Sequence, residues 1–403
     1  MRDLGGRFQR FWAASTVSAL GDGLLVVALP LLAKRANSSP AVIAGVYACG
    51  RLPWVFALPI GSIVDRRDAR KVLIVMDLVR AVALFGLGGW LLLGSHAPNA
   101  FAVAALAVVL STCAVAFYAG VQRVIPRLVS EPDLARANGL LESASLTGDQ
   151  LLGPAIGGVF AAHLSIPLVA DGLSFAGSAF VLSGMPSVPP TPKLGSSADE
   201  IRRGWNWFRQ HQAFRGLTFA TAVVATFSTF VVATEVVIVT ETLGLRDFWL
   251  GPLTAVIAAG AILGSLAAAR IIGRLGTNII PISAFLSGLL YLGASGSRSA
   301  AVVFPFLAAQ SALISVNNVS TASIRQRTAP AELRGRVIAL SRSIIYGVQV
   351  PGALIGGWIA KKYGTDTMLV VAGVALIVFS LATARPLRRI LETLPQPGSA
   401  MAK

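Results

Sequence analysis

The residues best placed to do chemistry in this chain are ionisable side chains inside long apolar segments. Asp22 lies eleven residues into the segment 11–33, which is about 16 Å along the axis if the segment is a helix. Arg51 lies at a similar depth in its own segment, so an Asp22–Arg51 ion pair is geometrically feasible. Buried carboxylates of this kind are costly and usually functional. We therefore expect Asp22 to serve in proton or substrate coupling, with a static partner for a helix charge or backbone group as the alternative and Asp149 as the next candidate.

Four other ionisable residues in apolar segments have simpler explanations. Asp77 and Arg80 are three residues apart, which is the spacing of a local ion pair on one helix. Asp171 and Glu235 are expected near the ends of their segments, where water can reach a carboxylate. These four residues are therefore secondary candidates.

Three further polar residues could line a cavity between helices. Asn317 and Asn318 lie inside the segment 301–323, where an amide either faces a cavity or hydrogen-bonds a neighbouring helix. Arg342 lies inside the segment 335–360 and could face either a cavity or an interfacial lipid. The sequence leaves both alternatives open for each residue.

A short basic loop joins the second and third apolar segments. It begins at Gly61, and Asp65 marks the end of the preceding segment, followed by Arg66, Arg70 and Lys71. The free N–H groups and the dipole at a helix N-terminus favour an anion. We expect Asp65 to contact the start of the eleventh segment in this way.

A repeated set of glycines relates the two halves of the chain. A shift of 199 residues places four glycines of the first half on four of the second, and this shared offset indicates a duplication. Small residues let helices approach closely, and a proline loosens the helix so that it can bend. We expect these residues at the interface of the two bundles, with plain close packing as the alternative. The set consists of Gly148, Gly153, Pro154, Gly157, Gly158, Gly347, Gly352, Gly356 and Gly357.

Crossing a bilayer as a helix takes about 20 apolar residues, and the chain offers twelve such segments. They are 11–33, 42–64, 72–93, 101–122, 139–162, 166–185, 215–240, 248–269, 278–295, 301–323, 335–360 and 367–384. We expect a six-helix bundle in 1–185, a second bundle in 215–385 and a cytoplasmic tail in 386–403. The link 186–214 is Pro-rich and then amphipathic, which favours a cytoplasmic linker followed by an interfacial helix.

Composition supports a membrane protein. The chain has 403 residues, of which 55% are apolar and only 13% charged, whereas a soluble domain carries about 25% charged residues. With the N-terminus inside, the inner segments hold 25 Lys and Arg and the outer loops 6, so the positive-inside rule places both termini in the cytoplasm. The expected fold class is an all-α membrane protein with twelve transmembrane helices in two pseudo-symmetric six-helix bundles.

Several function classes are excluded or disfavoured by the sequence. No phosphate-binding loop with a Gly-Lys-Ser/Thr ending is present, so the chain cannot use ATP by that route. The two cysteines and three histidines lack metal-ligand spacing. The net charge of +16 lies in short links between apolar segments, which argues for membrane orientation and against nucleic-acid binding. We expect no enzymatic activity, no cofactor and no metal, and a protein that works as a monomer.

Several pieces of the chain resemble the major facilitator transporters. The loop from Gly61 to Lys71 resembles the signature between their second and third helices. This resemblance implies that the contact of Asp65 closes the cytoplasmic side, so that the loop acts as a gate. The glycines of the fifth segment resemble an antiporter signature of exporting relatives. The resemblance is strongest to the branch of enterobactin exporters and macrolide efflux proteins. The residues that carry it include Phe11-Trp12, Ser18 to Asp22, Arg51-Leu-Pro53, Met76 to Ala81, Ala135 to Glu142, Ala170 to Phe175 and Leu333 to Val337.

The resemblance implies a secondary transporter of a bacterial inner membrane. Two six-helix halves would bind a small-molecule substrate between them near the bilayer midplane. We expect a proton-coupled exporter of amphipathic drugs or siderophore-like metabolites. The alternatives are an importer or a lipid or lysophospholipid flippase and, in another class, a receptor or scaffold without flux. Substrate, coupling ion and stoichiometry do not follow from the sequence.

Overall fold

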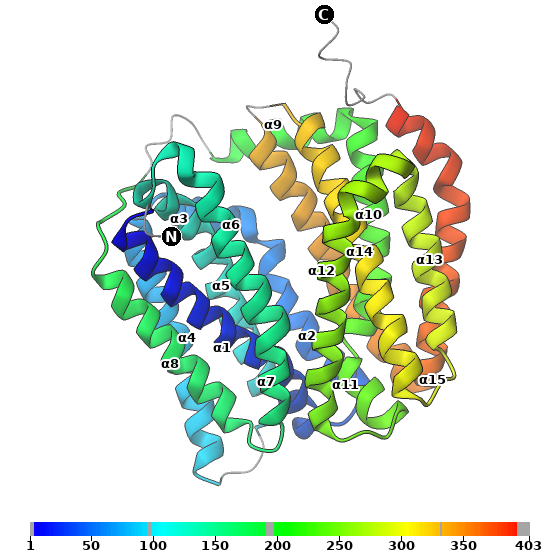
Figure 1. The fold of residues 1–403 in the computed structure, drawn as a ribbon, viewed down its shortest axis with the longest axis horizontal. Coiled ribbons are helices and arrows are strands. Elements are labelled where there is room, and N and C mark those ends of the chain that lie inside the picture. The colour runs from blue at the N-terminus through cyan, green and yellow to red at the C-terminus, as the bar shows by residue number, and fades with distance from the viewer. Residues whose placement is uncertain (1–3, 95–97, 191–196, 331–332, 393–403) are drawn as a thin grey trace, which may run out of the picture. The chain divides into compact units, whose positions relative to one another are not determined.

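The computed structural model describes residues 4–94, 98–190, 197–330 and 333–392, and every regular element in these ranges is a helix (Figure 1). The first half contains α1 (Gly6–Ala36), α2 (Pro40–Val55), α3 (Ala57–Asp65), α4 (Ala69–Leu92), α5 (Ala100–Leu128), η2 (Glu131–Asp133), α6 (Leu134–Ser145), η3 (Leu146–Leu152), α7 (Gly153–Val159) and α8 (Ser165–Ser183). The second half contains α9 (Ser197–Gln210), α10 (Gln212–Val232), α11 (Glu235–Val237), η4 (Ile238–Thr242), η5 (Asp247–Trp249), α12 (Leu250–Leu275), η6 (Gly276–Asn278), α13 (Ile279–Ala294), α14 (Ala300–Thr328) and α15 (Arg334–Glu392).

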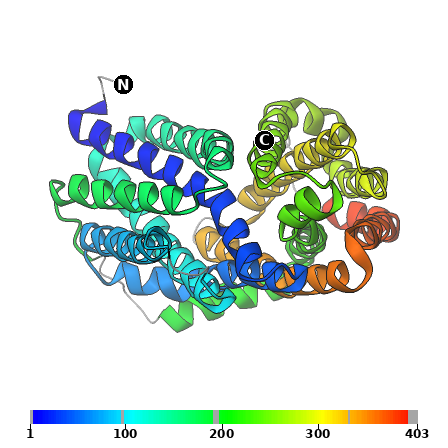
Figure 2. The same cartoon turned by 90° about the horizontal axis from the view of Figure 1, so that it is seen from below.

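These elements make the twelve membrane-crossing helices that the sequence predicts. Eight helices are each long and apolar enough to cross a bilayer, and the bent pair α2–α3 adds a ninth. α15 counts once among the eight, but its backbone leaves the helical conformation at Gly364 (φ 88°), so it contains two spans (Figure 2). α13 is a short apolar helix of 16 residues, and α6, η3 and α7 together form the remaining span.

Two of the spans are broken at prolines. α2 and α3 meet at an angle of 49°, because Pro59 has no N–H to donate to the carbonyl of Val55 one turn earlier. In the fifth span, Pro154 is the second residue of α7, which begins at Gly153 directly after the π-helical segment η3. The regular α-helix is thus interrupted by a widened turn just before the proline, and the bend expected at Pro154 stays a prediction.

Unit 1, one of two compact units in the chain, comprises 1–193 and 235–255. Within it α1 packs against α7 and α8, while α4 packs against α5 and α8 (Figure 1). One end of this unit has a core of Phe8, Phe11, Leu73, Ile125 and Leu182, among others. The segment 235–255 comes from the second half of the sequence, so the unit is larger than the bundle expected in 1–185.

Unit 2 comprises 194–234 and 256–403. In it α10 and α13 pack against α15, and α13 also packs against α14. α12 approaches α14 so closely that a Cβ on Gly260 or Gly264 would overlap the backbone of Ala308 or Ala312. This packing explains why two glycines one turn apart lie on α12.

The amphipathic part of the linker forms α9. Two of its aromatic residues, Trp207 and Phe208, pack within unit 2. Phe208 is buried with Phe214 and Val337, and Trp207 stacks on His211 with 3.8 Å between ring centroids. Trp205 is exposed, as an interfacial helix would require. Residues 191–196 of the linker and 393–403 of the tail lie outside the described residues.

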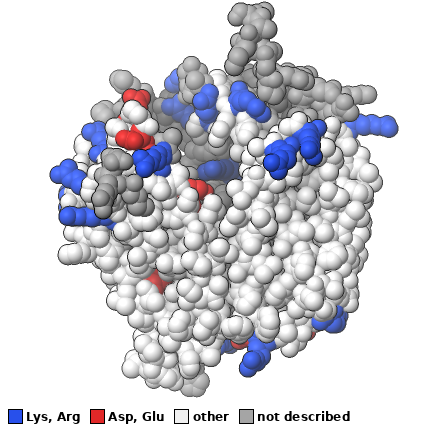
Figure 3. Space-filling view, in the orientation of Figure 1, with Lys and Arg blue, Asp and Glu red and all other residues white. Residues whose placement is uncertain are grey.

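Charged side chains are sparse over the middle of the visible surface. Most Lys and Arg lie toward the upper edge of the view and a few at the lower edge, and the band between them is largely uncharged apart from small acidic spots (Figure 3). Such a band is what lipid tails require of the surface of a membrane protein.

Candidate functional site

Two deeply buried charges of unit 1 lie on α4. Arg80 Nη2 donates to Asp77 Oδ1 at 2.6 Å, and both side chains are almost fully buried. The guanidinium also lies over the rings of Phe175 and Phe117, at 4.1 and 4.8 Å from their centroids. The local ion pair expected from the sequence is therefore confirmed, but it is deeply buried.

Asp22 is flanked by two glycines at which α1 contacts other helices. A Cβ on Gly21 would overlap Asp171 of α8, and a Cβ on Gly23 would lie 2.5 Å from the carbonyl oxygen of Gly148. These contacts fix α1 on both sides of Asp22, which is itself exposed. Asp22 interacts electrostatically with Arg80.

Arg51 lies in α2 beside an aromatic residue. Its Nε donates to the hydroxyl of Tyr47 at 2.9 Å, and the guanidinium lies 5.0 Å from the centroid of that ring. The expected alternation of an Asp22–Arg51 pair stays a prediction.

Asp149 lies in the π-helical segment η3. Ser145 Oγ donates to Asp149 Oδ2 at 2.9 Å, and the buried Oδ1 has no hydrogen-bond partner among the described residues. Asp22 and Glu142 both interact with it electrostatically. Two of the coupling candidates, Asp22 and Asp149, therefore interact electrostatically.

The burial of Asp171 is not predicted by the sequence. Its position indicates the end of a span, where water could reach it, but the side chain is fully buried in α8. Ser174 Oγ lies 2.9 Å from Asp171 Oδ1 and donates to it. The sequence held one signal for this environment, since Ser174 follows at the i+3 spacing of a helix neighbour. The close approach of Gly21 could not be read from the sequence.

The basic loop expected as a gate is held within unit 1 by arginines. Arg123 of α5 donates to the carbonyl of Val64 at 2.9 Å and to that of Pro189 at 2.6 Å. Arg70 donates to the carbonyl of Ser183 at 2.7 Å, at the end of α8. The loop is therefore tied to the ends of two helices and to the chain that follows α8.

Asp68, which the sequence analysis did not single out, organises the start of α4. Its carboxylate accepts from the N–H of Lys71 at 3.1 Å as the N-cap of the helix and also from Ser187 Oγ. Partial burial opposes ionisation, but these hydrogen bonds, with those from the N–H groups of Val188 and Arg70, hold the pKa of Asp68 below its usual value.

The remaining gate residues lie where α3 ends. Gly61 is inside α3 with open space around its Cα, Asp65 is the last helical residue and is half-buried, and Arg66 is exposed. Both Asp65 and Arg66 have polar or charged partners. The expected contact of Asp65 with the start of the eleventh span stays a prediction.

The first set of glycines brings the fifth span against α1 and the start of α12. A Cβ on Gly148 would lie 2.9 Å from Ala19, and one on Gly157 would lie 3.0 Å from the carbonyl oxygen of Leu24. A Cβ on Gly158 would lie 2.9 Å from the Cα of Gly251. Gly158 thus contacts a helix from the other half of the sequence, within unit 1, whereas the other two contact α1.

The second set repeats this arrangement in unit 2. A Cβ on Gly352 would lie 3.0 Å from Thr226, and one on Gly356 would lie 2.7 Å from the Cα of Phe230. The eleventh span therefore packs on the seventh as the fifth packs on the first. Gly357 is buried, and Gly347 has open space around it. Their role between bundles stays a prediction.

Of the cavity candidates, Asn317 is buried and its Oδ1 has no hydrogen-bond partner among the described residues, whereas Asn318 is exposed and Arg342 is exposed as well. Arg325, which is not among the sequence-predicted cavity residues, is buried in α14 and donates to Thr221 Oγ1 at 2.7 Å. Within the part of the chain that the structure describes, this arginine is hydrogen-bonded only to a hydroxyl, so its charge remains able to attract an anionic group.

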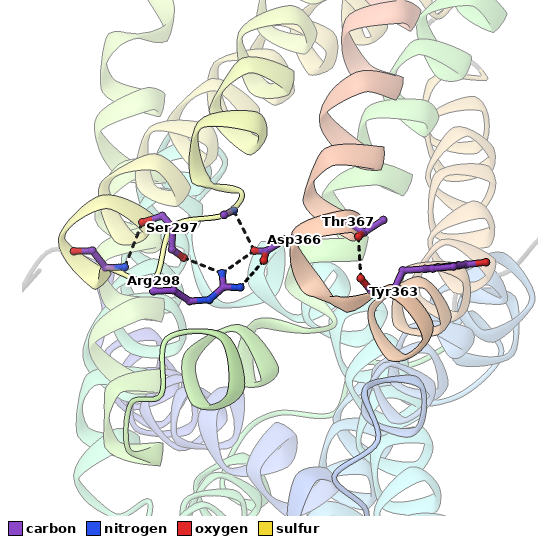
Figure 4. A network of polar contacts seen from close by, with 7 residues as sticks. Ser297, Arg298, Tyr363, Asp366 and Thr367 are labelled. Atoms are coloured by element: carbon purple, nitrogen blue, oxygen red, sulfur yellow. Dashed lines mark hydrogen bonds and ion pairs between the residues drawn. The ribbon is translucent and has the colours of Figure 1, made fainter.

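Ion pairs hold the ends of helices in both units. In unit 1, Lys34 Nζ lies 2.8 Å from Asp247 Oδ1, which joins the end of α1 to the residues before α12. In unit 2, Arg298 forms two hydrogen bonds to Asp366, just after the break at Gly364 (Figure 4). The hydrogen bonds from Arg298 hold the pKa of Asp366 below its usual value against a weaker effect of burial.

Two curated relatives cover nearly the whole chain. Multidrug efflux pump Tap of Mycobacterium tuberculosis (strain ATCC 25618 / H37Rv) is 26% identical over 410 residues, covering 95% of this chain and 94% of the relative. Macrolide efflux protein A of Streptococcus pyogenes is 24% identical, covering 93% of this chain and 94% of the relative.

Solved structures share the fold. A mutant of the nucleoside transporter NupG has a TM-score of 0.80 at 11% identity, covering 95% of this chain and all of that one. A bacterial homolog of the human lysosomal transporter Spinster, inward-facing and occupied, has a TM-score of 0.77 at 12% identity, covering 97% and 98%. The family model of the Major Facilitator Superfamily matches residues 11–348. The chain belongs to that superfamily of membrane transporters.

Proposed function

We propose that this protein is a proton-driven exporter of the bacterial inner membrane that moves amphipathic drugs or siderophore-like metabolites by alternating access. The observation that carries the proposal is a group of carboxylates in the spans of unit 1, where Asp22 interacts electrostatically with both Asp149 and Asp171. Carboxylates inside membrane helices commonly relay protons in pumps and transporters. Both named relatives are efflux proteins, and each matches this chain over nearly its full length.

The proposed orientation has both termini in the cytoplasm. The excess of Lys and Arg in alternate loops supports it, since positive charge is retained on the cytoplasmic side. In this orientation the Lys34–Asp247 pair and the Gly158–Gly251 contact lie on the outer side. Alternating access requires such contacts to break in each cycle, and a half-exposed ion pair costs little to separate.

Drug accumulation in an efflux-deficient bacterial host tests the proposal. Cells expressing the protein should accumulate less of a labelled macrolide than cells with an empty vector, and a protonophore should abolish the difference. Asp22→Asn should abolish uphill export at unchanged protein level, while Arg51→Gln should move the pH dependence of export upward. Asp149→Asn provides the matched comparison within the same group of carboxylates.

The alternatives give different results in the same assay. An importer would raise accumulation, a flippase would leave the macrolide unaffected but change the sidedness of a labelled lysophospholipid, and a scaffold would change neither. Any of these results would contradict the proposed exporter.

A further inference from the structure

Two carboxylates and one guanidinium are closed off inside unit 1, on two helices that pack together. Asp77 and Arg80 of α4 are 1% and 4% exposed, and Asp171 of α8 is 0% exposed. All three act on one another electrostatically. If every group were ionised, this interior cluster would carry a surplus negative charge.

Arg80 is already committed to Asp77. The two residues share a hydrogen bond of 2.6 Å on one helix, and the rings of Phe117 and Phe175 lie against the guanidinium at 4.8 and 4.1 Å. Packing on aromatic faces fixes the plane of an arginine as well as its position. Asp77 and Arg80 therefore form a neutral pair and leave the surplus charge to Asp171.

The carboxyl of Asp171 has one satisfied and one unsatisfied oxygen. Ser174 Oγ lies 2.9 Å from Oδ1 and 2.8 Å from the backbone carbonyl of Asp171, so its single proton serves both. Oδ2 is buried and has no hydrogen-bond partner among the described residues. The backbone of Gly21 covers the carboxyl from α1, because a side chain at Gly21 would overlap Oδ1.

The helices packed against α8 supply few other charges. The charged groups that act on Asp171 are Asp77 and Arg80 from α4 and Asp22 from α1. Two of these three are negative, and the positive one is paired. An ionised Asp171 would thus be a buried charge without its own counter-ion, which is far costlier than a neutral carboxylic acid in the same place.

We propose that Asp171 is a proton-binding site of this transporter and holds its proton on Oδ2, while Asp77 and Arg80 remain a fixed ion pair beside it. Its role in transport rests on the proposed proton-driven export. Binding forms one O–H bond at Oδ2, as one breaks on hydronium or on protonated Asp22, and no electrons are transferred. Asp22 directly follows Gly21, which covers Asp171, and acts on Asp171 electrostatically, so it is the neighbouring carboxyl with which Asp171 would exchange its proton.

A metal ion fits this place poorly. Among the described residues no three His, Cys, Asp or Glu side chains come together in a way that could hold a metal. A monovalent cation such as sodium is the remaining competitor for the surplus charge, and the experiment separates it from a proton.

Infrared spectroscopy of the full-length protein in lipid nanodiscs tests the assignment without any substrate. A protonated carboxyl gives a C=O stretch apart from ionised carboxylates, and the band shifts in deuterium oxide. The wild type should show one such component that disappears as the pH is raised, and Asp171→Asn should lack it. An unchanged band in Asp171→Asn overturns the proposal, as does a band in choline buffer that sodium removes at constant pH.

Two neighbouring substitutions test the same site if Asp171→Asn does not fold. Ser174→Ala removes a donor that favours the ionised form, so the midpoint of the titration should move to higher pH. Asp77→Asn releases Arg80 to act on Asp171 as a counter-ion, so the midpoint should move to lower pH. Opposite shifts identify Asp171, and unmoved midpoints in both variants overturn the assignment.

Transport measurements then separate this inference from the proposed function. If the infrared component belongs to Asp171 but macrolide export is absent, the proton site stands and the exporter proposal fails. If export is proton-driven in Asp171→Asn as in the wild type, the exporter proposal stands and Asp171 is not its proton site.

Discussion

Arg80 is the residue on which the interior of unit 1 depends most directly. It neutralises Asp77 and fills the space between two aromatic rings. Arg80→Met should therefore destabilise the protein by about 3–5 kcal/mol, because it leaves a buried carboxylate uncompensated. Thermal unfolding in detergent measures the effect.

A matched double variant separates charge from packing at this site. Asp77→Asn combined with Arg80→Met removes both charges, so it should recover most of the lost stability. Equal stability of the single and double variants would contradict the account. Arg80→Lys should not substitute fully, because an ammonium lacks the planar face that stacks on the rings.

The N-cap role of Asp68 leads to a prediction about pH at the loop between α3 and α4. Asp68→Ala should lower stability by about 0.5–2 kcal/mol through loss of the N-cap, whereas Asp68→Asn should cost much less, since an asparagine also caps helices. The folded pKa of Asp68 is lowered, so the ionic part of its contribution is present above the unfolded value, about 3.9. It is lost as the pH falls through the lowered folded value.

Thermal unfolding of these two variants at neutral and acid pH checks the sign. The difference in stability between the wild type and the Asp68→Asn variant should shrink on acidification, because the wild-type carboxylate becomes protonated. A difference that grows in acid would show that Asp68 does not act through its ionised form.

At the scale of single residues, the sequence predicts which ionisable residues lie deep in a span better than it predicts which residues they contact. Asp22 and Asp149 are identified by depth in an apolar segment, and the Asp77–Arg80 pair by helical spacing. The burial of Asp171 depends on the backbone of Gly21, which is about 150 residues away in the chain and is brought there by packing. No local pattern contains that information.

At the scale of helices, glycines allow the backbones of neighbouring helices to come into direct contact. At Gly158 a Cβ would meet the carbonyl oxygen of Phe248 at 2.8 Å and the Cα of Gly251 at 2.9 Å. Backbone atoms cannot move aside cheaply, so Gly158→Ala should cost about 1–3 kcal/mol of stability, as overpacking does elsewhere. The measurement is again thermal unfolding, combined with export activity.

Gly139→Ala is the control for this prediction. Gly139 lies in α6 with open space around it, so alanine should be neutral or stabilise the helix by up to about 1 kcal/mol. If Gly158→Ala behaves like Gly139→Ala, the close approach of α7 and α12 does not constrain the protein.

Helix number follows from the sequence because apolar length is a direct requirement of the bilayer. The positions of helix ends and breaks are predicted less accurately from the sequence. The short gap expected between the last two spans is a single non-helical residue, Gly364, and a π-helical segment that the sequence does not predict precedes Pro154. Both depend on how neighbouring helices satisfy the backbone, which a single sequence does not describe.

At the scale of the whole molecule, the Lys34–Asp247 pair joins parts of both sequence halves within unit 1. If the pair must break in each transport cycle, Lys34→Asp should weaken this contact and change the transport rate. The charge-reversed double variant, Lys34→Asp with Asp247→Lys, should restore it. Export that is impaired equally in the single and double variants would contradict a role for the ion pair.

The internal repeat is the strongest whole-molecule signal in the sequence. The offset of 199 residues correctly pairs the fifth span with the eleventh, since each packs on the first helix of its own half, α1 or α10. The division into units is harder to predict from the sequence, because residues 235–255 belong to unit 1 although they come from the second half of the chain. That grouping depends on contacts at the far ends of helices, where sequence patterns are weakest.

The central claim, proton-driven export, is tested most directly in proteoliposomes that contain only the purified protein. Substrate uptake is measured with an acidic interior, using a labelled macrolide and a membrane potential clamped at zero. The account predicts accumulation above the external concentration that requires the pH gradient, collapses with nigericin and is lost in Asp22→Asn. Uptake that is equal with and without the gradient, or no greater than in protein-free liposomes, would contradict it.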